Sequence, residues 1–110
     1  MINDKQDCIE SLTGGLKSTS AWRKVTSARF PDDTRNAKAA KVLDRLAVEA
    51  INLTDAQWLE LSPYFGWASE TWRNGLNQAS RQIGFFHRAG DLDVFVKILI
   101  QNLSVSCVAA

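Results

Sequence analysis

The stretch from Asp32 to Ile51 constrains the fold most, because it carries the clearest helical pattern in the chain. Apolar residues recur there at i, i+4, i+7 and i+11, which places them on one face of an α-helix. These residues are Ala39, Leu43, Leu46 and Ala50. Pro31 suits a helix start, and Asp32 and Asp33 complement the positive end of the helix dipole. We therefore expect an amphipathic helix over 32–51, with a stripe of small side chains that a second helix can approach closely.

A second helix is predicted just after this one, in the stretch LTDAQWLEL. Thr54 and Gln57 have the spacing of a capping box, and Leu53 and Trp58 have that of a hydrophobic staple. Pro63 disfavours the helical conformation at the residue before it, so this helix should be short.

A third helix is predicted over 69–88. Ser69 can cap it, Glu70 suits its first turn, and apolar residues follow at steps of four, three, four and three. These are Trp72, Leu76, Ala79, Ile83 and Phe86.

A last helix is expected over 91–103, where apolar residues spread around the whole circumference. Such a helix lies at the centre of a core or forms half of an oligomer interface, and a homodimer through 91–103 is left open.

Together these patterns predict an all-α protein: a single compact domain of about five helices, arranged as a bundle or an orthogonal array. Residues 11–20 are rich in Ser, Thr and Gly, which predicts a flexible join. We therefore expect a flexible segment at 1–19 with at most one short helix, a helical domain at 20–104 and a tail at 105–110. A short helix from Ser20 to Phe30 should turn Ala21, Val25 and Ala28 inward, with Arg23 outward.

Length and composition agree with one ordinary globular domain, since the 110 residues are 45% hydrophobic and 23% charged. The N-terminus lacks the basic and apolar pattern of a signal peptide, and the apolar runs are too short for a membrane span. Cys8 and Cys107 stand apart, without a CxxC pattern, and are read as free thiols. A cytoplasmic location is the expectation.

Three aromatic residues, Tyr64, Phe65 and Trp67, lie in the connection between the second and third predicted helices. Large rings usually pack inside, so we expect at least two of them to cap the core. Trp67, between Gly66 and Ala68, is the one expected to be exposed. All three are candidate partner-binding residues.

Enzyme chemistry has little support. His87 is placed near a helix end, and the acidic pairs Asp32-Asp33 and Asp91-x-Asp93 open predicted helices, where dipoles explain them. Gly14-Gly15 lacks the Lys-Ser/Thr of a phosphate-binding loop. No catalytic residue, metal ligand or cofactor is predicted, and the chain is not expected to be an enzyme.

Nucleic-acid binding is the sharper alternative. Residues 17–45 hold eight basic and three acidic side chains, a net +5, and part of this charge forms a ridge on the helix over 32–51: Arg35, Lys38, Lys41 and Arg45. The outer face of the helix over 69–88 offers side chains that pair with base edges: Arg73, Asn74, Asn77 and Arg81. Against this, the chain's net charge is only +1, and the connection is too long for a helix-turn-helix.

A small protein-interaction module is the leading interpretation. Four Trp in 110 residues and a last helix that is apolar on all sides supply more contact candidates than one small monomer needs. The process in which such a module takes part is not indicated by the sequence.

Overall fold

The computed structural model describes the backbone of residues 4–65, 69–83 and 92–109, and the side chains of these ranges except Ser69 and 105–109. Five helices occur in them: α1 (Asp4–Arg29), α2 (Arg35–Ala50), α3 (Asp55–Leu61), α4 (Ser69–Gln82) and α5 (Leu92–Ala109). These ranges contain no strand. The protein is a single all-α domain, as predicted.

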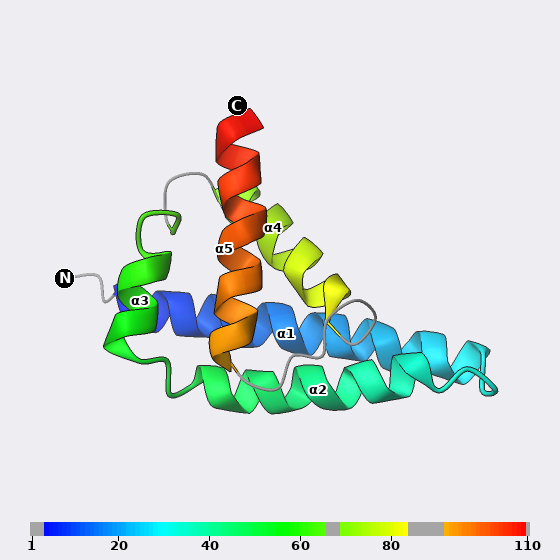
Figure 1. Ribbon diagram of the computed structural model, residues 1–110. Coiled ribbons are helices and arrows are strands. Elements are labelled where there is room, and N and C mark those ends of the chain that lie inside the picture. The colour runs from blue at the N-terminus through cyan, green and yellow to red at the C-terminus, as the bar shows by residue number, and fades with distance from the viewer. Residues whose placement is uncertain (1–3, 66–68, 84–91, 110) are drawn as a thin grey trace.

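The helices form a layered array rather than a parallel bundle (Figure 1). The first two, α1 and α2, lie antiparallel and packed side by side. Helix α5 stands across this pair, α4 packs against both α1 and α5, and α3 lies beside α5. Because α5 contacts α2, α3 and α4, it is covered on several sides.

That position explains the apolar circumference of α5. Phe95, Val96, Leu99 and Leu103 are fully buried, whereas Val94 keeps 38% of its surface exposed. The interpretation of α5 as a central helix is confirmed, and a homodimer through it stays a prediction. Val94 lies on the side of α5 that faces α3, which covers it only in part.

The two strongest local predictions are confirmed. All four residues of the apolar stripe in α2 are buried, and the small Ala39 and Ala50 let α1 pack closely. Thr54 caps α3. The Gln57 backbone N–H donates to Thr54 Oγ1 at 3.1 Å, and the Thr54 backbone N–H donates to Gln57 Oε1 at 3.0 Å. This is the capping box.

The expected boundary near residue 20 is wrong. Residues 4–19 belong to one continuous helix, α1, and its Cys8, Leu12 and Leu16 are fully buried. Glycine, serine and threonine cost a helix roughly 0.5–1 kcal/mol each relative to alanine, but burial of an apolar face outweighs this cost. The signal in the sequence was the spacing of Ile9, Leu12 and Leu16, which continues the core stripe toward the N-terminus.

The inward face predicted for the segment 20–30 is also wrong. Ala21 and Val25 are exposed, and Arg23 is buried, with 4% of its surface exposed. Because α1 is continuous, the periodicity begun at Leu12 and Leu16 continues through this segment. Arg23 donates from Nη1 to Asn36 Oδ1 at 3.1 Å and from Nη2 to the Arg81 carbonyl oxygen at 2.6 Å. That carbonyl lies in the last turn of α4, where the negative end of the helix dipole favours a cation.

Other helix boundaries shift by a few residues. Helix α2 begins at Arg35 rather than Asp32, with the Asp33 carboxylate accepting the Arg35 backbone N–H at 3.1 Å. Helix α4 ends at Gln82, so the predicted continuation to 88, including Phe86 and His87, lies outside the described residues. The expected tail over 105–110 is instead part of α5 as far as Ala109.

Two glycines set how closely the helices cross. A Cβ atom added to Gly15 of α1 would lie 2.5 Å from Cδ2 of Leu76 in α4. One added to Gly75 of α4 would lie 2.5 Å from Cδ2 of Leu103 in α5. A hydrogen atom in place of a methyl group therefore allows α4 to approach both neighbours.

Candidate functional site

The described aromatic residues between α3 and α4, Tyr64 and Phe65, are both half-buried. The half-buried Phe65 ring stands edge-to-face with Trp58 (centroids 5.8 Å apart) and with Trp72 (5.0 Å), while Trp72 is buried. Trp72 Nε1 donates to Ser11 Oγ at 2.7 Å, which satisfies its one polar atom. Phe65 therefore caps the core. Trp67 lies outside the described residues.

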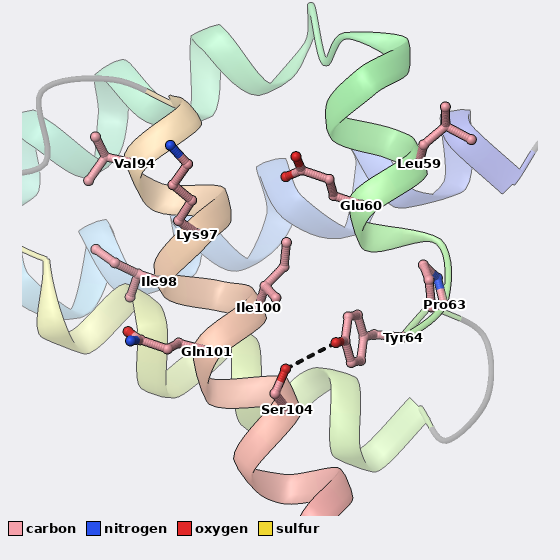
Figure 2. Close-up of a pocket in the computed structure, with 10 residues that line it drawn as sticks. All are labelled: Leu59, Glu60, Pro63, Tyr64, Val94, Lys97, Ile98, Ile100, Gln101 and Ser104. Atoms are coloured by element: carbon pink, nitrogen blue, oxygen red, sulfur yellow. Dashed lines mark hydrogen bonds between the residues drawn. The ribbon is translucent and has the colours of Figure 1, made fainter.

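Tyr64 has a second role. It is half-buried, and its hydroxyl oxygen lies 3.0 Å from Ser104 Oγ, a hydrogen bond that joins the end of α3 to α5. Tyr64 also forms part of the wall of an open groove between these two helices (Figure 2). Of the two aromatic candidates that the structure describes, Tyr64 lines this groove, and Phe65 lines a separate hollow between α1 and α4.

The groove between α3 and α5 has a volume of about 890 Å³ and is mostly apolar. Its apolar walls come from Leu59, Pro63 and Tyr64 on one side and Val94, Ile98 and Ile100 on the other. Leu59 keeps 69% of its surface exposed and projects from the α3 wall. Sequence reasoning missed Leu59, because it lies between the half-buried Trp58 and the exposed Glu60, and only the packing of α3 shows which side of the helix faces out.

The charges at the mouth of the groove are unequal. Lys97 on the α5 wall pairs with Asp93 at 3.3 Å, one helical turn earlier. Glu60, on the α3 wall, has no ion-pair partner among the described residues. In Figure 2 the Glu60 carboxylate points toward the opening between the helices. The mouth therefore offers a single uncompensated negative charge.

The basic ridge predicted on α2 is exposed along its whole length: Arg35, Lys38, Lys41 and Arg45. Arg35 pairs with Asp33, Nη2 to Oδ2 at 2.8 Å, and the hydrogen bonds from Arg35 lower the pKa of Asp33 to about 2. The ridge lies on α2 and the predicted base-reading face lies on α4, two helices that each pack on α1.

The α4 candidates are all exposed, but they divide between two hollows. Asn74, Asn77 and Arg81 line a polar hollow of about 420 Å³ together with Gln78 and with Asn102 from α5. Arg73 lines a different hollow between α1 and α4, near Trp72 and Leu76, and Asn77 lines this hollow as well. The sequence did not indicate that Asn102 would join this group, because it lies on another helix, more than 20 residues away along the chain.

A cluster of two arginines and a tryptophan lies where α1 meets the end of α4. Trp22 is half exposed, and the guanidinium carbons of Arg23 and Arg81 lie 5.0 and 5.8 Å from its ring centroid. These distances are those of cation–π contacts. The pKa of Arg23 is lowered, first by burial and then by the positive charge of Arg81.

Cys8 and the acidic side chains in the described part of the chain bear on nucleophile and metal-binding chemistry. Burial raises the pKa of the Cys8 thiol to about 12, so it stays protonated at neutral pH. The described ranges hold no cluster of three or more His, Cys, Asp or Glu side chains that could ligate a metal. Nor does any described helix combine the length and apolar content needed to cross a membrane.

Comparison with known proteins adds no family to these observations. A scan against protein-family models, a search of curated proteins and a search of solved structures all return no match to this chain.

Proposed function

We propose that this chain is a non-enzymatic protein-interaction module that docks an amphipathic helix of a partner protein in the groove between α3 and α5. The observation that carries the proposal is the groove itself: a mostly apolar channel between two helices, with Leu59 and Val94 exposed at its edges. Exposed apolar grooves of this kind bind an amphipathic helix, whose apolar residues at i, i+3 or i+4, and i+7 lie in the groove.

The contacts around the groove support a preformed site. The Tyr64–Ser104 hydrogen bond joins its two walls, and Phe65 holds the end of α3 against Trp58 and Trp72. A groove held open by its own scaffold needs little rearrangement to bind, which lowers the entropic cost of association.

The charge pattern favours a partner helix with a basic residue beside its apolar stripe. Lys97 is already paired with Asp93, whereas Glu60 has no described partner and faces the opening. A lysine or arginine of the ligand can pair with Glu60. A ligand acid in the same position would meet a like charge.

The test uses a fluorescein-labelled helical peptide of about 15 residues, long enough to form a helix when bound. Its leucines repeat at helical spacing with one flanking lysine, and a peptide of the same composition with scrambled spacing is the control. Fluorescence anisotropy should show binding of the patterned peptide only. Equal binding of both peptides would contradict docking in the groove.

Two protein variants make the test specific. Leu59→Ala should weaken binding by about 1–2 kcal/mol, roughly 5- to 30-fold, because it truncates an apolar anchor in the wall. Val48→Ala is the matched control, since Val48 is 64% exposed on α2 and does not line the groove. If both variants bind the peptide as the wild type does, the groove is not the docking site.

Charge reversal tests the orientation of the partner. Glu60→Lys should weaken binding of the lysine-flanked peptide, and replacing the peptide's lysine with glutamate should restore it. Sedimentation velocity over a wide protein concentration range separates this outcome from self-association, in which a second copy would occupy the groove without any peptide.

A further inference from the structure

A second hollow, unconnected with the docking groove, is built from amide side chains. It lies between the C-terminal half of α4 and α5, and Asn74, Asn77, Gln78 and Arg81 line it from α4, with Asn102 opposite. Its volume of about 420 Å³ falls within the roughly 300–1,000 Å³ of small-molecule sites. It is therefore of a size to enclose one small ligand rather than the edge of a duplex.

The walls of this hollow are free of negative charge. The sequence has no Asp or Glu from Thr71 to Gly90, and none from Val94 to Ala110. Arg81 is the charged side chain among the lining residues, and the others donate and accept hydrogen bonds without charge. Such a set suits a ligand that is anionic at one end and hydrogen-bonding at the other.

The far wall is held in place. Asn102 donates from Nδ2 to the Ile98 carbonyl oxygen at 2.8 Å and to Gln82 Oε1 at 3.4 Å, which orients its amide. The close crossing at Gly75, against Leu103, sets the separation of α4 and α5 beside it. The amides on the two helices therefore keep a defined separation without a ligand.

One end of the hollow adjoins an aromatic and cationic cluster. The Arg81 guanidinium lies over the half-exposed Trp22 ring, and Arg23 lies over the same ring. Hydrogen bonds to Asn36 and to the Arg81 carbonyl oxygen hold Arg23 beside Arg81. Two guanidinium groups held near one ring repel each other, and a bound anion reduces that repulsion.

We propose that this hollow binds one unpaired nucleotide, with the base edge on the amides of Asn77 and Gln78 and a phosphate on Arg81. Asn and Gln amides match the paired donors and acceptors of base edges, and a guanidinium matches phosphate oxygens in a bidentate fashion. Trp22 offers an aromatic ring next to Arg81, as sites for single-stranded nucleic acid do. A free mononucleotide and a nucleotide of a single strand share this chemistry.

The experiment is fluorescence anisotropy with fluorescein-labelled single-stranded homopolymers of dA, dT and dC, with AMP and GMP as competitors and a duplex as control. Single strands should bind more tightly than the duplex. The log–log dependence on salt should be shallow, with a slope near −0.7 for each phosphate neutralised, so about −0.7 to −1.4 for one or two phosphates. Competition by AMP or GMP would identify a mononucleotide site, and competition by oligonucleotides alone a strand site.

Matched variants locate the site. Arg81→Gln and Asn77→Ala change exposed residues of the hollow and should each weaken binding by about 5- to 100-fold. Arg73→Gln removes the same charge from the same helix outside the hollow and should change binding less than twofold. Equal losses in Arg73→Gln and Arg81→Gln, tighter binding of the duplex, or no binding of any probe would each overturn the proposal. The peptide assay on the groove is independent of all these outcomes.

Discussion

Helix α5 meets its neighbours in two different ways. On the α4 side, Gly75 lets the two helices cross so closely that an added methyl group would collide with Leu103. On the α3 side, the walls stand apart and leave an apolar groove of about 890 Å³, joined near one end by the Tyr64–Ser104 hydrogen bond. The α4–α5 crossing is close because Gly75 has no side chain, whereas the α3–α5 contact leaves a groove.

The difference shows how a small domain can combine stability with an exposed apolar surface. The closed crossings of α4 with α1 and α5 bury Trp72, Leu76 and Leu103 in the core, and burial of apolar surface stabilises the fold. The open α3–α5 side leaves Leu59 and Val94 exposed. Such surface costs stability, so its presence fits a site for a partner.

The largest expected effect breaks the closed side. Trp72→Ala should destabilise the fold by about 3–5 kcal/mol, because it removes a buried ring, leaves a cavity and orphans Ser11 Oγ. Total stability is typically about 5–15 kcal/mol, so chemical denaturation will show a large fall in midpoint. The control is Trp22→Ala, whose ring is 49% exposed and should cost much less. Equal losses would mean that the crossing does not depend on Trp72.

Filling the close crossings should come next in size. Gly15→Ala and Gly75→Ala each force a methyl group against a buried leucine, a clash that costs about 1–3 kcal/mol in packed cores. The gain in helix propensity, roughly 0.5–1 kcal/mol, offsets only part of it. Thermal unfolding of both variants should show a lower Tm than the wild type. An unchanged or higher Tm would show that α4 can move away at no cost.

A smaller effect is expected on the open side. Tyr64→Phe keeps the ring and removes the hydroxyl that bonds Ser104, so the loss should be about 0.5–1.5 kcal/mol. Ser104→Ala should cost a similar amount, and the double variant should cost less than the sum of the two. Strictly additive losses in urea unfolding would rule out the hydrogen bond as the link between α3 and α5.

The smallest effect has the opposite sign. Gly14 is adjacent to Gly15 in α1, but a Cβ atom there meets nothing within 4 Å. Gly14→Ala should therefore stabilise the protein by about 0.5–1 kcal/mol through helix propensity alone. Comparing the Tm of Gly14→Ala with that of Gly15→Ala separates the gain in helix propensity from the cost of the clash at the α1–α4 crossing. A destabilised Gly14→Ala would mean that α1 is not helical at this point.

Local patterns in the sequence predicted much of the fold because their physical causes are local. The capping box at Thr54 and Gln57 needs only four consecutive residues, and the stripe of α2 needs only helical periodicity. The inward packing of Phe65 was expected from the size of its ring and is confirmed. The expected flexible segment at 1–19 is wrong, because the propensities of Gly, Ser and Thr do not report the burial that holds α1 together.

The candidate sites depend more on packing than on pattern. Asn74, Asn77 and Arg81 were named from their spacing on one helix, but their common hollow needs Asn102 from α5 to complete it. Leu59 carried no distinguishing signal, because a leucine in a short amphipathic helix can face either the core or the surface. Arg23 was expected outside, and only Asn36 and the end of α4 show why a buried cation is stable there.

The sequence by itself determined that this chain is helical, where four of its helices lie to within a few residues and which faces of α2 and α4 are buried. Helical periodicity and caps act over a few residues and can be read directly from the chain. Only the tertiary structure decided that α1 is one long helix, that α5 is central and that α3 stands away from it. Those outcomes depend on contacts between residues far apart in the chain, such as Gly15 with Leu76 and Tyr64 with Ser104, which local periodicity and propensity do not report.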